Sequence, residues 1–135
     1  MAVSPRDLLA IAQELIGREG EINHRTAANR AYYAAFHFCS TVAASLPPPL
    51  TPGRRSHERL ISKLKNHPVS KATEDFDLNV RTLGNLLAKA KPLRVHADYL
   101  IGEEFGRAKA EELIPRAEKI RDVANELTET LSVDT

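Results

Sequence analysis

Apolar residues recur at helical spacing along nearly the whole chain, and no stretch shows the strict alternation that is typical of a strand. The pattern predicts helices over residues 5–18, from 23 or 26 to 45, over 56–66, from 73–77 to 91, and from 103–105 to 131. Short connections between amphipathic helices favour an up-and-down bundle. We therefore expect an all-α fold, a bundle of four to five helices, as one domain over residues 1–135.

Capping residues and prolines mark where these helices begin and end. We expect N-terminal caps at Ser4, at Asn23 or Thr26, and at Ser56, because Ser, Asn and Thr side chains can accept from free backbone N–H groups. Residues 46–55 hold four prolines and a glycine, so this stretch cannot be helical. It is expected to form a surface loop, with a proline-rich docking segment as the alternative.

Two further prolines fall inside helical patterns. Pro92 is expected to end or interrupt the fourth helix, which would leave residues 92–101 as an ordered loop or short turn. Pro115 should kink or divide the last helix.

The second helix carries the best-spaced set of polar side chains. Arg30 and His37 are seven positions apart, so they fall on nearly the same face, separated by two turns and about 10 Å along the axis. Tyr33 lies between them on the same stripe. The opposite face should belong to the core; its members are Ala28, Tyr32, Ala35, Cys39 and Val42. The thiol of Cys39 is therefore expected to be packed rather than reactive.

This stripe offers the groups needed to cleave RNA without a metal. The reaction needs a base for the 2′-OH, an acid for the leaving oxygen and a cation for the phosphate. Histidine suits proton transfer because its free pKa is about 6.5, and the planar guanidinium of arginine can hold two phosphate oxygens. Arg30 and His37 supply one group of each kind. One histidine cannot easily serve as both acid and base, so a two-fold dimer would complete the set.

Three motifs resemble those of HEPN domains, which are small helical domains that include many ribonucleases of toxin–antitoxin, phage-defence and CRISPR systems. They are NRAYYAAFH at residues 29–37, SHERLI at 56–61 and RVHADY at 94–99, and the resemblance spans roughly residues 5–131. It implies a homodimer in which an R-x4–6-H pair meets its copy across the two-fold interface. Arg30 would then bind phosphate, His37 would transfer the proton, and Tyr33 would orient the substrate or donate a hydrogen bond. It also implies RNA or nucleotide as a partner, and a nucleotidyltransferase-like antitoxin.

Two positions depart from that family. Active members usually carry Asn, Asp or His after the arginine, where this chain has Ala31, and members with a modified tyrosine have it where this chain has Cys39. The alternative function is therefore a non-catalytic bundle that binds nucleotide, RNA or a partner protein. In that case Arg30 could pair with a buried acid such as Asp98.

Four more residues are candidates for a supporting or substrate-binding role. His57 could face the same cleft as His37, or hydrogen-bond locally at a helix start. Arg94, Asp98 and Tyr99 are expected to form an ion-pair and hydroxyl network, because a desolvated guanidinium is costly without a partner.

Composition and charge narrow the class of protein. The chain is 42% hydrophobic and 27% charged, with a net charge of +1. Residues 54–71 hold six Lys/Arg against one acid, and residues 98–135 hold ten acids against five bases. A chain with this distribution can present one basic face although its total charge is near zero. We expect a cytoplasmic protein without membrane spans, because apolar runs are short, there is no signal pattern and only one cysteine is present.

No metal site and no cofactor are expected, since the single Glu21/His24 pair lacks the second pair and the further Glu of a bundle metal site.

Overall fold

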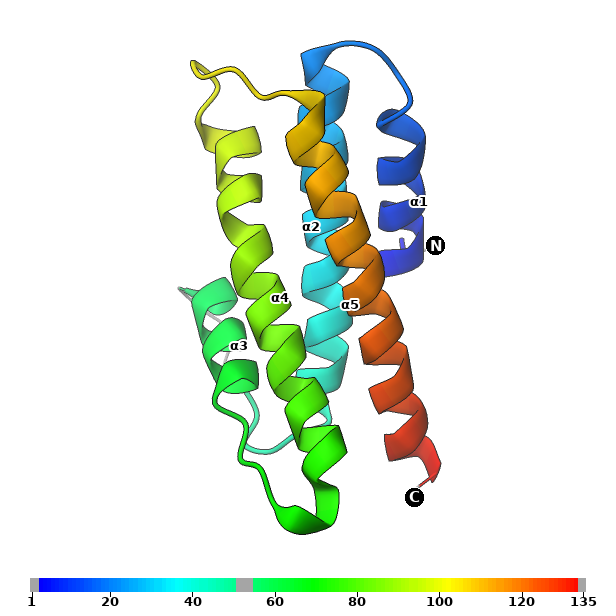
Figure 1. Cartoon of the computed structure of the whole chain (residues 1–135), viewed down its shortest axis with the longest axis vertical. Coiled ribbons are helices and arrows are strands. Elements are labelled where there is room, and N and C mark those ends of the chain that lie inside the picture. Colours follow the sequence, from blue (N-terminus) through cyan, green and yellow to red (C-terminus); the bar gives the residue numbers. More distant parts are fainter. Residues whose placement is uncertain (1–2, 51–54, 134–135) are drawn as a thin grey trace.

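The computed structural model describes residues 3–50 and 55–133, and these residues contain five α-helices and one short 3₁₀ helix (Figure 1). Their bounds are α1 Pro5–Leu15, α2 Glu21–Ala44, α3 Ser56–Lys65, η1 Lys71–Thr73, α4 Glu74–Tyr99 and α5 Arg107–Val133. The described residues include no strand, which confirms the predicted all-α class. None of their helices is both long enough and apolar enough to span a bilayer.

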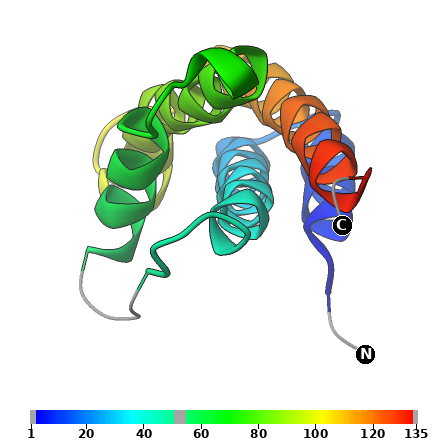
Figure 2. The ribbon, with the colours of Figure 1, turned by 90° about the horizontal axis from the view of Figure 1, so that it is seen from below.

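α2 is the central helix of the bundle. α3, α4, α5 and α1 form an arc around it, and one side of α2 stays open (Figure 2). Six of its alanines are buried, and these small side chains let the neighbouring helices approach its backbone. The core face predicted for this helix is confirmed, because Ala28, Tyr32, Ala35, Cys39 and Val42 are all fully buried. Burial raises the pKa of the Cys39 thiol to about 12, so this thiol is a packing group.

α3 lies against α4 at a point that only glycine permits. A Cβ added to Gly84 of α4 would lie 2.6 Å from the backbone nitrogen of Lys65 and 2.9 Å from the Cβ of Leu64. Both contacts are shorter than packed atoms tolerate. The absence of a side chain at Gly84 therefore sets the distance between the two helices.

The connection from α3 to α4 is fixed by one buried carboxylate. Asp77 accepts hydrogen bonds from the Thr73 hydroxyl (2.7 Å) and the Ser70 backbone N–H (3.0 Å), and its other oxygen lies 2.7 Å from the Nε2 of His67. These hydrogen bonds, those of Thr73 and Ser70 first, lower the pKa of Asp77 to about 2.

The predicted end of the fourth helix was wrong. α4 continues through Pro92 to Tyr99, so residues 92–99 are helical and not a loop. Pro92 is exposed, where water can satisfy the carbonyl that loses its helical donor. The turns beyond it are held by the ion pair of Arg94 with Asp98 and by hydrogen bonds from Arg25 of α2. α5 likewise runs through Pro115 without being divided.

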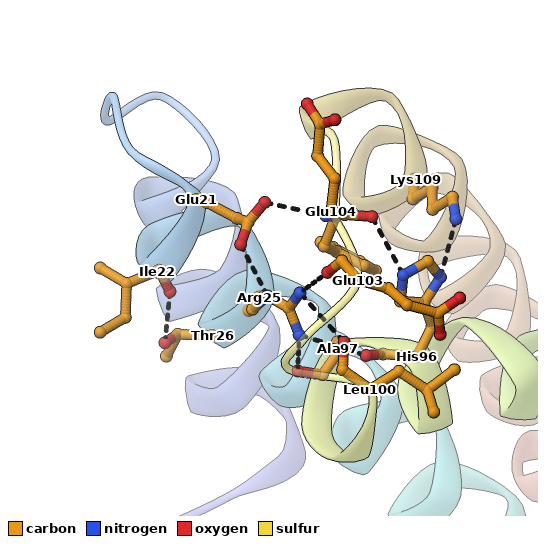
Figure 3. Close-up of polar contacts among 11 residues, drawn as sticks. Glu21, Ile22, Arg25, Thr26, His96, Ala97, Leu100, Glu103, Glu104 and Lys109 are labelled. Atoms are coloured by element: carbon orange, nitrogen blue, oxygen red, sulfur yellow. Dashed lines mark hydrogen bonds and ion pairs between the residues drawn. The ribbon is translucent and has the colours of Figure 1, made fainter.

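Arg25 makes the bonds that hold the end of α4 (Figure 3). Its guanidinium donates to the carbonyl oxygens of His96 (3.3 Å), Ala97 (3.0 Å), Leu100 (3.3 Å) and Glu103. Glu21 pairs with Arg25 at 3.1 Å and accepts the backbone N–H of Phe105 at 2.8 Å. We call Glu21 and Arg25 with these backbone partners the Arg25 clamp. It gives donors to the carbonyls of His96 and Ala97 in the last turn of α4 and to those of Leu100 and Glu103 in the segment that follows.

Several helix starts also differ from the prediction. α2 begins at Glu21 after Gly20, whose φ of +105° suits glycine, so Asn23 and Thr26 lie inside the helix. α3 begins at Ser56 itself, preceded by Arg55 in the left-handed region. Ser4 does cap α1, through a capping box with Asp7. α1 ends at Leu15 rather than residue 18, and α5 begins at Arg107 rather than 103–105.

The proline-rich stretch is described only in part. Residues 46–50 are outside any helix, as predicted, and residues 51–54 lie outside the described residues. Lys63 of α3 holds the described part against α2, donating to the carbonyl oxygens of Ala43 (2.8 Å), Leu46 and Pro48 (2.7 Å).

Candidate functional site

The predicted polar stripe lies on the side of α2 that no other helix covers. Arg30 and His37 are exposed and Tyr33 is half-buried. We call this side the open face of α2; its members are Arg30, Tyr33, His37, Ser40, Thr41 and Ala44. The open face continues into a hollow of about 560 Å³ between α1 and α2, which His37, Ser40, Thr41 and Leu8 help to line. His37 therefore stands at the wall of a depression and is open to a ligand.

The guanidinium of Arg94 reaches the base of this face from α4. It donates to the Tyr33 hydroxyl at 2.9 Å and to the Tyr99 hydroxyl at 3.2 Å, and it lies 5.0 to 5.7 Å from the ring centres of Tyr32, Tyr33 and Tyr99. We call these three tyrosines the tyrosine cluster. Burial disfavours the charged form of Arg94, but Tyr33, Tyr99 and Asp98 outweigh it, so its pKa lies above the ordinary value. Arg94 is a largely buried cation, and it makes the predicted contacts with the Asp98 carboxylate and the Tyr99 hydroxyl.

Asp98 pairs with Arg94 and not with Arg30. Its Oδ2 lies 3.0 Å from the Nε of Arg94, a close electrostatic contact in which the Nε–H is not directed at the carboxylate. The same oxygen accepts a hydrogen bond from the Asn29 amide at 2.9 Å, and the Asn29 oxygen accepts one from Arg30 at 3.1 Å. The direct Arg30–Asp98 pair considered from the sequence was wrong, because Asn29 lies between the two. Asn29 begins the first motif, but its bridging role depends on a contact 69 residues away along the chain.

His57 faces the same cluster from the start of α3. Its Nδ1 lies 2.9 Å from the hydroxyl of Tyr32, and its ring lies 4.2 Å from the ring of Phe36. Burial raises the pKa of Tyr32, so the hydroxyl keeps its proton and can donate it to Nδ1. Burial, and then the charges of Arg94, Lys91 and His37, lower the pKa of His57. The result is a neutral imidazole whose Nε2–H is the remaining donor.

Together these contacts place the predicted site residues in two groups. The tyrosine-cluster group contains Tyr33, His57, Arg94, Asp98 and Tyr99, joined by direct contacts. Arg30 and His37 lie beside it on the open face, and Arg30 is tied to the group through Asn29. The arrangement offers an exposed guanidinium, an exposed imidazole and oriented neutral donors, which suits an anionic ligand.

The described residues contain no group of three or more His, Cys, Asp or Glu side chains that could hold a metal ion.

Comparison with known proteins agrees with the fold and the motifs. No curated protein and no solved structure matched the chain. The family model that matches is the HEPN domain, over residues 6–127, nearly the whole chain. The protein therefore belongs to the HEPN domain family.

Proposed function

We propose that this protein is a metal-independent endoribonuclease of a toxin–antitoxin or defence system, with Arg30 and His37 acting at a dimer cleft. Members of its family are often nuclease-like or nucleotide-binding. The observation that carries the proposal is the exposure of both side chains on the open face of α2. Within residues 3–50 and 55–133, no carboxylate forms an ion pair with either of them, so both are available to a substrate.

The proposed reaction is transesterification at the ribose 2′ oxygen. A base takes the 2′-OH proton, the 2′ oxygen bonds to phosphorus, and the bond to the 5′ oxygen breaks as that oxygen receives a proton. The products carry a 2′,3′-cyclic phosphate and a 5′-OH. Arg30 would bind the non-bridging oxygens, whose charge grows in the transition state, and His37 would carry a proton.

A second subunit would supply the second imidazole. A two-fold axis through the open face would bring each residue near its own copy, and Ser40 and Ala44 are small enough to let two α2 helices approach closely. Tyr33 would keep its position in such a dimer because Arg94 holds its hydroxyl. A nucleotidyltransferase-like antitoxin is the partner that we propose to restrain the enzyme.

One observation favours the non-catalytic alternative. The position after Arg30, where active relatives carry a polar side chain, is an alanine in this chain. Ala31 is also fully buried, so it contributes nothing to the open face. A bundle that binds RNA or nucleotide without cutting it would need only the cations and donors of the site.

The test compares the purified chain with His37→Ala and Arg30→Ala on total RNA in excess EDTA. We expect cleavage that leaves cyclic-phosphate ends and that both substitutions reduce at least a hundredfold. Arg107→Ala, which removes an exposed guanidinium on α5, is the matched control and should cleave normally. Equal products from the parent, His37→Ala and Arg30→Ala would reject the nuclease and favour the binding function. A protein that stays monomeric across the micromolar range would also contradict the proposed cleft.

A further inference from the structure

The imidazole of His57 is held along one edge and free along the other. Its Nδ1 lies 2.9 Å from the Tyr32 hydroxyl, and its ring stacks on the Tyr32 ring with the centres 5.5 Å apart. The Phe36 ring lies 4.2 Å away and helps to fix the plane of the imidazole. Within residues 3–50 and 55–133, no group forms a hydrogen bond with Nε2, and this atom is not sealed from solvent. The ring is therefore fixed in place, and its Nε2 edge is available to a ligand.

The free edge of His57 lies beside the open face of α2. The Tyr33 ring, which belongs to that face, is 6.0 Å from the His57 ring. The Phe36 ring lies next to both imidazoles, 5.5 Å from that of His37 and 4.2 Å from that of His57. Tyr32, which holds Nδ1, is fully buried in the core. The edge that carries Nε2 therefore points away from the core, beside Tyr33 and His37.

The Nε2 atom of His57 carries a hydrogen that it can donate. Burial keeps the Tyr32 hydroxyl protonated, so this hydroxyl donates to Nδ1, and the hydrogen of the neutral imidazole is on Nε2. Burial and the neighbouring positive charges, that of Arg94 first, lower the pKa of His57 and disfavour the imidazolium. Since both nitrogens are occupied, this imidazole has no free site for a further proton. It is a fixed neutral donor, a group that suits a developing negative charge.

We infer that His57 donates its Nε2–H from α3 to a non-bridging oxygen of the scissile phosphate. This inference rests on the nuclease proposed above. It gives three side chains different tasks: Arg30 supplies the positive charge, His37 carries the proton, and His57 supplies a donor of fixed direction. Because the charge on the phosphate oxygens grows in the transition state, the hydrogen bond from His57 strengthens there and speeds the reaction.

Two amide substitutions separate this donor from the contact with Tyr32. Asparagine places its amide atoms where Nδ1 lies, so His57→Asn keeps an acceptor for Tyr32 but has no N–H at the position of Nε2. Glutamine places its amide one bond further out, so His57→Gln keeps an N–H there and loses the acceptor. A histidine that only held Tyr32 would tolerate asparagine better, whereas a donor to phosphate tolerates glutamine better. His24→Asn is the matched control, because His24 lies at the start of α2 and contacts the Arg18 carbonyl oxygen.

Cleavage is measured with a DNA hexamer that carries a single central ribose. We expect the parent, His24→Asn and His57→Gln to agree within about threefold, and His57→Asn to cleave about 10- to 100-fold more slowly, a smaller loss than in an oxyanion site closed to water. The shape of the pH–rate curve should not change in either His57 variant, since the proton is carried by His37. Binding is followed by the ¹⁵N resonances of the histidines when the all-deoxy hexamer, which has no 2′-OH to react, is added. We expect the His57 Nε2 resonance to move and those of His24 to stay.

The outcomes separate the donor from the nuclease. If the parent cleaves, and His57→Gln loses as much activity as His57→Asn or more, or neither variant loses any, the donor is refuted and the nuclease stands. If the parent cleaves nothing but the hexamer moves the His57 Nε2 resonance, the nuclease is refuted and the contact with phosphate stands. A His57 resonance that the bound hexamer leaves unmoved refutes the donor, and no binding together with no cleavage refutes both. The resonance is read on the parent chain, so this result does not depend on the folding of a variant.

Discussion

Gly84→Ala tests how closely α3 lies against α4, and hence how His57 is positioned. The substitution adds one methyl group to α4 at the point where α3 ends. That methyl would lie 2.6 Å from the Lys65 backbone nitrogen, 2.8 Å from the Lys65 Cγ and 2.9 Å from the Leu64 Cβ. The Lys65 side chain can move aside, but the backbone and the fully buried Leu64 cannot do so without shifting α3.

Two effects of opposite sign decide the result. Alanine in place of glycine inside a helix favours folding by about 1 kcal/mol. Forcing a methyl group into a packed contact costs about 1 to 3 kcal/mol. The obstacle here is backbone, so we take the upper part of that range and expect a net loss of about 1 to 2 kcal/mol. For a chain of this length, that loss lowers Tm by roughly 3 to 10 °C.

Urea unfolding followed by circular dichroism measures the net effect. Asn85→Ala is the matched control, because it adds an alanine one position further along α4 on the exposed surface. It should raise the free energy of unfolding by a few tenths of a kcal/mol. If Gly84→Ala were as stable as the parent or more so, the close approach of α3 and α4 would be wrong. The position of His57 against Tyr32 would then need another explanation.

Three further substitutions test other parts of the fold. Arg25→Met should lower the free energy of unfolding, measured in urea, by about 1.5 to 3 kcal/mol, because it removes charged hydrogen bonds to the end of α4. Arg18→Met removes an exposed ion pair and should lower it by less than about 1 kcal/mol. Equal losses in the two variants would contradict the Arg25 clamp. Folding lowers the pKa of Asp77 from an ordinary 3.8 to about 2, so the stabilisation from its carboxylate is complete above about pH 4 and is lost as the pH falls toward 2. Asp77→Asn should flatten this part of the curve of unfolding free energy against pH. An unchanged curve would refute the hydrogen-bond network of Asp77. Lys63→Met should speed proteolysis near residue 48, since that lysine holds the carbonyl oxygens there, and an unchanged cleavage rate would contradict its role.

Helical periodicity was enough to predict the fold class, the core face of α2 and the open stripe of Arg30, Tyr33 and His37. Those features depend on spacing within one helix, which the sequence displays directly. The end of α4 could not be predicted from local rules, because the partner that stabilises it, Arg25, is more than 70 residues away in the chain. The ion pair of Asp98 with Arg94 was predicted, but its second partner, the amide of Asn29, was missed for the same reason. The Asn29 amide of α2 donates to the Asp98 carboxylate of α4, and no spacing in the sequence indicates this hydrogen bond.

Arg94 and Arg30 lie near the same tyrosines, but their surroundings allow them different tasks. Arg94 is only 11% exposed, and its guanidinium is already engaged by Asp98 and two hydroxyls. A phosphate could reach it only by breaking those contacts, at a cost that includes leaving the half-buried carboxylate of Asp98 without its ion-pair partner. Arg30 is exposed and gives up one hydrogen bond, which it donates to the neutral amide oxygen of Asn29, when it turns to a ligand. Arg94 therefore keeps Tyr33 in place, and Arg30 is the guanidinium that the proposed nuclease would use to contact its substrate.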